Sequence, residues 1–86
     1  MTPQVIRTTI LGQLASARPY ALPQPMLLEA VNMLVRPQLS LGELVKQLSW
    51  LKAQDMVAFI PSDLEPDNAD ARKWTIKEAG MAAIAK

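Results

Sequence analysis

The sequence has no cysteine and no histidine among its 86 residues. Without cysteine there can be no disulfides, zinc–thiolate sites or thiol nucleophiles, and without histidine the commonest general base and metal ligand is missing. The carboxylates cluster only in a stretch expected to form a loop, and no glycine-rich phosphate-binding motif accompanies them. We therefore expect a protein that is not an enzyme and that has no catalytic residue, no cofactor and no metal ion.

Long hydrophobic runs are also missing. Polar residues interrupt every window long enough to cross a bilayer, and residues 1–14, MTPQVIRTTILGQL, lack the layout of a signal peptide. The expectation is a soluble cytoplasmic protein without a membrane partner. Half of the residues are apolar and a fifth are charged, as in folded chains. A chain of this length can bury one core but not two, so residues 1–86 are expected to form a single domain.

The acidic residues are concentrated in one segment. Residues 62–71, SDLEPDNADA, hold four of the eight acidic residues and none of the nine basic residues. The rest of the chain therefore carries nine minus four, or +5, although the net charge is only +1. A net charge of +1 neither favours nor excludes a nucleic-acid partner. The segregation of charge is the more informative observation.

Two helices are predicted in the first half of the chain. Thr2 followed by Pro3 is typical of an N-cap and first helical position, which predicts a helix over residues 3–17. A short extended piece is expected at residues 20–22, and a second helix over residues 25–35, which Arg36-Pro37 would end. Helical spacing predicts that the buried face of this second helix consists of Met26, Leu27, Ala30, Val31 and Leu34.

A third helix is predicted over residues 41–54. Ser40 and Glu43 have the spacing of a capping box. The residues expected to face the core, within an arc of roughly 120°, are Leu41, Leu44, Val45, Leu48 and Leu51. Those expected to face outward are Glu43, Lys46, Gln47, Trp50 and Gln54. Asp55 follows where the helix should end, and aspartate tolerates the left-handed conformation that is common there.

The last third of the chain predicts a hairpin, residues 57–76, followed by a helix. VAFI at 57–60 and KWTI at 73–76 have strand character, and the acidic segment 62–71 would form the tip. Thr75 and Glu78 have capping-box spacing, which predicts a final helix over residues 76–85. Small and apolar residues on this helix favour pairing of two copies in a homodimer; they are Ala79, Met81, Ala83 and Ile84.

LSWLKAQDMVAF, residues 48–59, followed at a hairpin's distance by WTIKEAGMAAI, residues 74–84, resembles the winged-helix pattern of ArsR-, MarR- and PadR-type regulators. The run from YALPQPMLLEAVNML, residues 20–34, through residue 57 is similar to the small winged-helix proteins of Mu-like phages and prophages. The resemblance implies a mostly helical α+β fold: a winged helix-turn-helix with a three-helix core, a two-stranded wing and a C-terminal helix.

The resemblance also implies a cytoplasmic transcription regulator that binds double-stranded DNA. The third helix would enter the major groove and the wing would touch the DNA backbone or the minor groove. Because the acidic tip would repel phosphates, contacts are expected on the third helix and at the base of the wing. The DNA-binding residues implied are Gly42, Glu43, Lys46, Gln47, Trp50, Arg72 and Lys73. Further bases that could meet phosphates, if they converge on one side, are Arg7, Arg18, Arg36 and Lys52.

The two tryptophans and the acidic tip leave alternatives open. Trp74 alternates with Ile76 and is expected in the core, whereas Trp50 is either covered by the wing strands or part of a partner surface. Asp63, Glu65 and Asp67 have the spacing of calcium ligands, but the glycine and the final glutamate of such a loop are missing. The alternative function is a winged-helix adaptor that binds a protein partner through Trp50, Asp63, Glu65 and Asp67.

Overall fold

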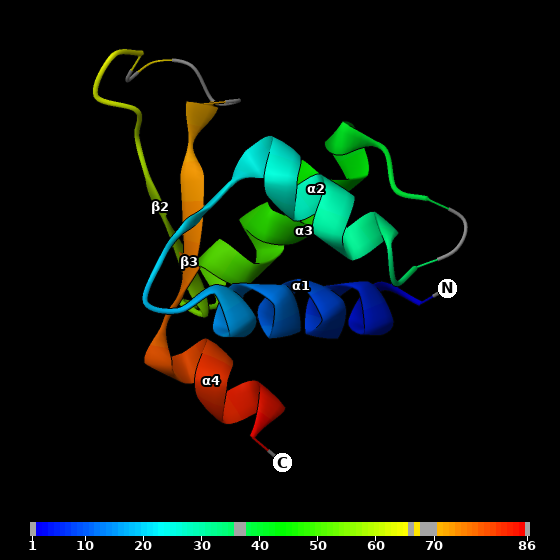
Figure 1. Cartoon of the computed structure of the whole chain (residues 1–86). Coiled ribbons are helices and arrows are strands. Elements are labelled where there is room, and N and C mark those ends of the chain that lie inside the picture. The colour runs from blue at the N-terminus through cyan, green and yellow to red at the C-terminus, as the bar shows by residue number, and fades with distance from the viewer. Residues whose placement is uncertain (1, 36–37, 66, 68–70, 86) are drawn as a thin grey trace.

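The computed structural model describes residues 2–35, 38–65, 67 and 71–85. Its elements, in chain order, are α1 (Pro3–Ala17), β1 (Leu22–Pro23), α2 (Gln24–Asn32), α3 (Leu41–Ala53), β2 (Val57–Ile60), β3 (Lys73–Ile76) and α4 (Glu78–Ile84). The expected mostly helical α+β class is confirmed. In Figure 1, α1 lies between α2 and α3 on one side and α4 on the other, and the β2–β3 hairpin extends beyond the helices.

The starts of α1 and α3 are set by side-chain caps. The Val5 N–H donates to the Thr2 hydroxyl at 3.3 Å, and Pro3 occupies the first turn, where its missing N–H costs nothing. The Glu43 N–H donates to the Ser40 hydroxyl at 3.2 Å. α1 has the predicted bounds, and α3 ends one residue earlier than predicted.

The end of α3 is a Schellman motif built on Asp55. Asp55 has φ 60°, its N–H donates to the Lys52 carbonyl, and the Met56 N–H donates to the Leu51 carbonyl. These two bonds satisfy carbonyls that the last turn would otherwise leave unpaired. The left-handed conformation predicted for Asp55 is confirmed, and it turns the chain directly into β2.

α2 differs from the prediction in length and in its buried face. The helix ends at Asn32 instead of residue 35, and the predicted stop at Arg36-Pro37 lies outside the described residues. Met26 and Leu34 were expected in the core but are 56% and 62% exposed. Leu27 and Val31 are buried as predicted, and the other buried residues of this segment are Gln24 and Val35. The four residues buried are thus Gln24, Leu27, Val31 and Val35. Their spacing is close to four residues, so the core-facing stripe lies one position away from the predicted one.

The loop after α2 is held by Asn32. Its side-chain oxygen accepts the Leu39 N–H at 2.7 Å, and its amide nitrogen donates to the Leu39 carbonyl at 3.1 Å. A side chain that satisfies both backbone groups of one residue replaces the hydrogen bonds of a regular element. The contact fixes the chain just before the Ser40 cap of α3.

The sheet has three antiparallel strands, in the order β1-β3-β2. Two are the predicted wing strands, and the third, β1, lies close to the short extended piece that was expected at residues 20–22. β2 and β3 pair in the register Val57↔Ile76 to Ile60↔Lys73, as expected for a hairpin. β1 adds Leu22↔Trp74 and Pro23↔Lys73 on the other edge of β3. Two residues, one of them proline, give almost no strand signal, and proline is tolerated in β1 because the strand lies at the edge.

The predicted capping box at the start of α4 is wrong. Thr75 lies within β3 opposite Ala58, and α4 begins only at Glu78, with Lys77 as the N-cap residue. Sheet pairing therefore competes successfully with the local capping signal. The Lys77 N–H donates to the Met56 carbonyl at 2.9 Å, which ties the start of α4 to the turn after α3.

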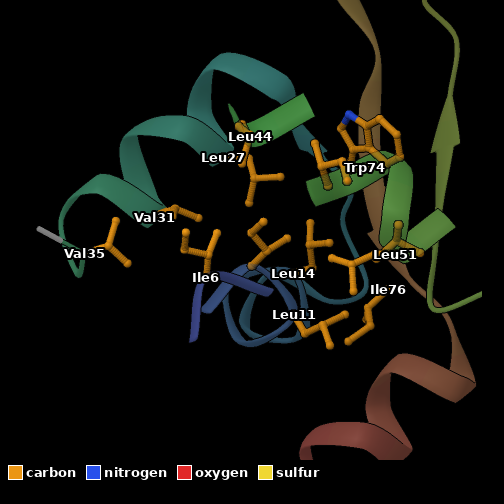
Figure 2. Packing of buried hydrophobic residues seen from close by; sticks show 13 residues of the cluster. Ile6, Leu11, Leu14, Leu27, Val31, Val35, Leu44, Leu51, Trp74 and Ile76 are labelled. Atoms are coloured by element: carbon orange, nitrogen blue, oxygen red, sulfur yellow. The ribbon is translucent and has the colours of Figure 1, made fainter. Parts of the chain in front are cut away.

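The hydrophobic core is formed between α1, α2, α3 and the sheet (Figure 2). α1 contributes one face, α2 and α3 cover it, and Trp74 and Ile76 bring β3 onto the same cluster. The buried hydrophobic residues are Ile6, Ile10, Leu11, Leu14, Leu27, Val31, Val35, Leu44, Leu48, Leu51, Val57, Trp74 and Ile76. In the described part of the chain, no helix is long and apolar enough to cross a membrane.

Candidate functional site

The outward face of α3 differs from the face predicted by helical geometry. Gln47 was expected to face outward, but only 5% of it is exposed, whereas Val45, expected in the core, is exposed. The buried residues of α3 are Leu44, Gln47, Leu48 and Leu51, so the buried arc is rotated by roughly half a residue step from the predicted one at 100° per residue. The outward face, opposite this arc, consists of Gly42, Val45, Lys46, Ser49 and Ala53, and the exposed side chains of Glu43, Trp50 and Lys52 flank it.

Gln47 is buried because α1 supplies its partner. The Arg7 Nε donates to the Gln47 side-chain oxygen at 2.8 Å, across the contact between α1 and α3. The guanidinium of Arg7 also lies 3.7 Å from the centroid of the Trp50 ring, a favourable cation–π geometry. Trp50, 39% exposed, is therefore covered on one face by Arg7 of α1. α3 is therefore held against α1 by the contacts of Arg7 with Gln47 and Trp50.

A second cluster lies between α3 and the sheet, where two cations flank one aromatic ring. The Arg72 guanidinium lies 4.2 Å from the Phe59 ring centroid, and the Lys52 ammonium lies 5.3 Å from it. Phe59 is directly opposite Trp74 in the β2–β3 register, and their rings are 5.5 Å apart. Phe59, packed against Trp74, therefore brings together the cations Lys52 of α3 and Arg72 at the base of the wing.

The floor of this cluster is fixed by hydrogen bonds from the start of α2. The Trp74 indole N–H donates to the Gln24 side-chain oxygen at 3.1 Å, and the Gln24 N–H donates to the Arg72 carbonyl at 3.1 Å. Gln24 and Trp74 are both buried. Arg72 is thus positioned through its backbone by α2 and through its side chain by Phe59.

The cluster lines an open hollow of about 450 Å³, which we call the α3–wing notch. The residues that line the notch are Gln24, Val45, Ser49, Lys52, Ala53, Phe59, Arg72 and Trp74. None of them is acidic. Val45, Ser49 and Ala53 also belong to the outward face of α3, so the notch is continuous with that face.

The other predicted site residues lie apart from the notch. Lys73 precedes Trp74 in β3, and successive side chains of a strand point to opposite faces, so Lys73 faces away from Phe59. Glu43 is exposed in the first turn of α3. In the acidic tip, Asp63, Glu65 and Asp67 are exposed, the Ser62 hydroxyl accepts the Leu64 and Glu65 N–H groups, and Asp70 lies outside the described residues.

No family model, no curated protein and no solved structure matches this chain. The arrangement of its own side chains is therefore the basis for any functional assignment. Charge alone identified Lys46, Lys52 and Arg72 as candidates, because they are bases on the third helix and the wing. Phe59 and Gln24 were missed, since only the tertiary structure brings them to the cations.

Proposed function

We propose that the protein is a winged-helix DNA-binding protein of the transcription-regulator type, like the phage proteins that its sequence resembles. The observation that carries the proposal is the position of Lys46, Lys52 and Arg72 around one continuous surface, the outward face of α3 and the adjoining notch. The order of helices and strands and the hairpin beside α3 support it, since a winged helix places a reading helix in the major groove with the wing next to it.

The chemistry of the outward face of α3 suits the major groove. Lysine can donate to guanine O6 and N7 or to a phosphate, the serine hydroxyl to several base edges, and valine methyl groups can contact the thymine methyl. Gly42 adds no side chain at the N-terminal end, where the helix can approach closely. The reading residues we propose are Lys46, Val45 and Ser49, and Gln47 is removed from the set because it is buried against Arg7.

A charge reversal at Lys46 tests the proposal. We expect Lys46→Glu to weaken binding to mixed duplex fragments by roughly tenfold or more at low salt, and to reduce the salt slope by about one. Fluorescence anisotropy with labelled duplex over a series of salt concentrations measures both. Arg18→Glu is the matched control, because it reverses one exposed charge after α1, outside the α3 face. If the two variants bind alike, α3 is not the reading helix; if the parent protein does not bind duplex, the DNA-binding proposal fails.

The alternative, a protein adaptor that uses Trp50, Asp63, Glu65 and Asp67, has weaker support. One face of the Trp50 ring is already occupied by the Arg7 guanidinium, and a docking anchor needs a ring that is free to enter a partner's pocket. The homodimer is also a proposal. It is supported by the exposed small residues Ala79, Ala82 and Ala83 on α4, and sedimentation velocity over a range of protein concentrations tests it.

A further inference from the structure

The α3–wing notch holds two positive charges, and none of the described residues that line it is acidic. Lys52 and Arg72 flank the same Phe59 ring, and the described residues provide neither of them with an ion pair. Like charges that share a small region repel each other, and this repulsion is relieved when an anion lies between them. The Phe59 ring offsets part of the repulsion, because its face attracts both cations.

Arg72 has a second unmet requirement. Its Nε is buried and has no hydrogen-bond partner among the described atoms. A buried donor without a partner is costly, and the cost is larger for a charged group. The guanidinium charge is delocalised, so an anion beside its other nitrogens would stabilise the whole group. Arg72 is therefore positioned at a cost that a bound anion would offset.

The lining of the notch indicates what kind of anion fits. Arg72, Lys52 and the Ser49 hydroxyl supply donors from three separate side chains, which suits a group with three or four oxygen atoms better than a planar carboxylate. Val45, Ala53 and the two aromatic rings supply an apolar wall beside these donors. A volume of about 450 Å³ leaves room for more than the anion alone.

We propose that the α3–wing notch is a binding site for a phosphate group together with its attached sugar, held by Arg72, Lys52 and Ser49. Two sources provide this chemistry: the backbone of a nucleic acid, or a free nucleotide. The first source rests on the proposed DNA-binding function, whereas the site itself does not. In the nucleic-acid case, the site places one backbone phosphate at the base of the wing instead of at its acidic tip.

The Trp74 indole N–H reports directly on the notch, because it donates to Gln24 in the notch floor. We expect inorganic phosphate and deoxyadenosine monophosphate each to shift its NMR signal saturably, with the nucleotide binding more tightly. Sodium chloride and sodium acetate at the same ionic strength should not do so. A Trp50→Phe variant assigns the two indole signals. If phosphate shifts the Trp74 signal no more than acetate does, the phosphate site is refuted.

Substitutions in the notch show whether phosphate binds at this site or is attracted by the positive charge of the protein in general. Lys52→Ala and Arg72→Gln should each weaken phosphate binding by roughly tenfold, the worth of one charge-assisted hydrogen bond. Lys52 is exposed on α3, so its substitution leaves the fold intact. Lys73→Ala is the matched control, since it removes one charge on the opposite face of β3 and should leave binding unchanged. Equal binding by Lys52→Ala, Arg72→Gln and Lys73→Ala would overturn the proposal.

Adding duplex DNA identifies the source. If duplex shifts the Trp74 signal and displaces phosphate, the site holds a backbone phosphate. If duplex binds through α3 and leaves the Trp74 signal and phosphate binding unchanged, the site stands with a free nucleotide as its ligand. If duplex does not bind while phosphate does, the DNA-binding proposal fails and the phosphate site stands. The two proposals therefore fail on different measurements.

Discussion

Asp55 is the only described residue that has a positive φ. The left-handed conformation costs an ordinary L-residue roughly 1 kcal/mol compared with glycine, and aspartate somewhat less. Its carboxylate also forms an exposed ion pair with the Lys77 ammonium, and such a pair is worth about 0 to 1 kcal/mol. Backbone geometry and charge therefore both act at this position.

Two substitutions at Asp55 separate these effects. Asp55→Ala should lower the free energy of unfolding by about 1 kcal/mol, because alanine keeps the strained backbone and loses the ion pair. Asp55→Gly should leave it nearly unchanged, because relief of the backbone offsets the lost pair. Urea denaturation followed by circular dichroism measures both. Equal stability of the two variants would mean that the left-handed residue does not control the end of α3.

At the scale of the elements, α4 is fastened to the rest of the fold through Gly80. A Cβ atom built on Gly80 would lie 2.5 Å from the Met56 carbonyl oxygen and 2.7 Å from Ile76 Cγ1. The carbonyl oxygen belongs to the backbone and already accepts the Lys77 N–H, so it cannot move aside without a loss. Glycine is needed here because α4 and the turn after α3 approach each other closely.

We therefore expect Gly80→Ala to destabilise the protein by roughly 2 kcal/mol, the usual cost of overpacking. Gly12→Ala is the matched control. Gly12 lies inside α1 with no atom within 4 Å of an added Cβ, so alanine there should stabilise the helix by about 0.5 to 1 kcal/mol. Thermal unfolding should move the two midpoints in opposite directions. A Gly80→Ala variant as stable as the parent would show that α4 is not packed tightly on the turn.

Elements set by local chemistry could be predicted from the sequence. The Thr2 and Ser40 caps and the left-handed Asp55 depend on neighbouring residues only, and the strands at 57–60 and 73–76 carry their own β propensity. A short extended piece before α2 was expected, but its pairing in the sheet could not be predicted, because β1 is a strand only through its contact with β3. The predicted Thr75 cap is wrong for a related reason, because Thr75 pairs with Ala58 in the sheet and is not at the start of α4.

The candidate site was predictable only in part. The positions of Lys46 and Arg72 on the third helix and at the wing base follow from element order. The exact set of α3 residues that face the core does not follow from the sequence, because hydrophobic periodicity defines the buried face of a helix only to within about one residue step. The sequence predicts Gln47 on the polar surface, but in the structure it is buried because Arg7 of α1 donates a hydrogen bond to it. A buried glutamine with a charged partner gives no sign of its burial in the sequence.

Charge is segregated across the molecule as a whole. The proposed DNA surface carries Lys46, Lys52 and Arg72, while Asp63, Glu65 and Asp67 are exposed at the far end of the hairpin. A wing that adjoins the reading helix brings its tip near the duplex, where carboxylates repel phosphates over about one Debye length. In the proposed function, the acidic tip limits binding that does not depend on sequence.

Neutralising the tip tests this role. The triple variant Asp63→Asn, Glu65→Gln, Asp67→Asn should bind random-sequence duplex roughly three- to tenfold more tightly at low salt, since the repulsion between tip and backbone is removed, and the gain should shrink as salt screens it. Anisotropy titrations at two ionic strengths measure the gain.

Glu29→Gln with Glu78→Gln is the control, because it removes acidic charge on α2 and α4, away from the wing. If the control gains as much as the triple variant, only net charge matters. If neither gains, the tip is an inert loop, and the preference for α3 and the notch as the DNA surface rests on their own cations alone.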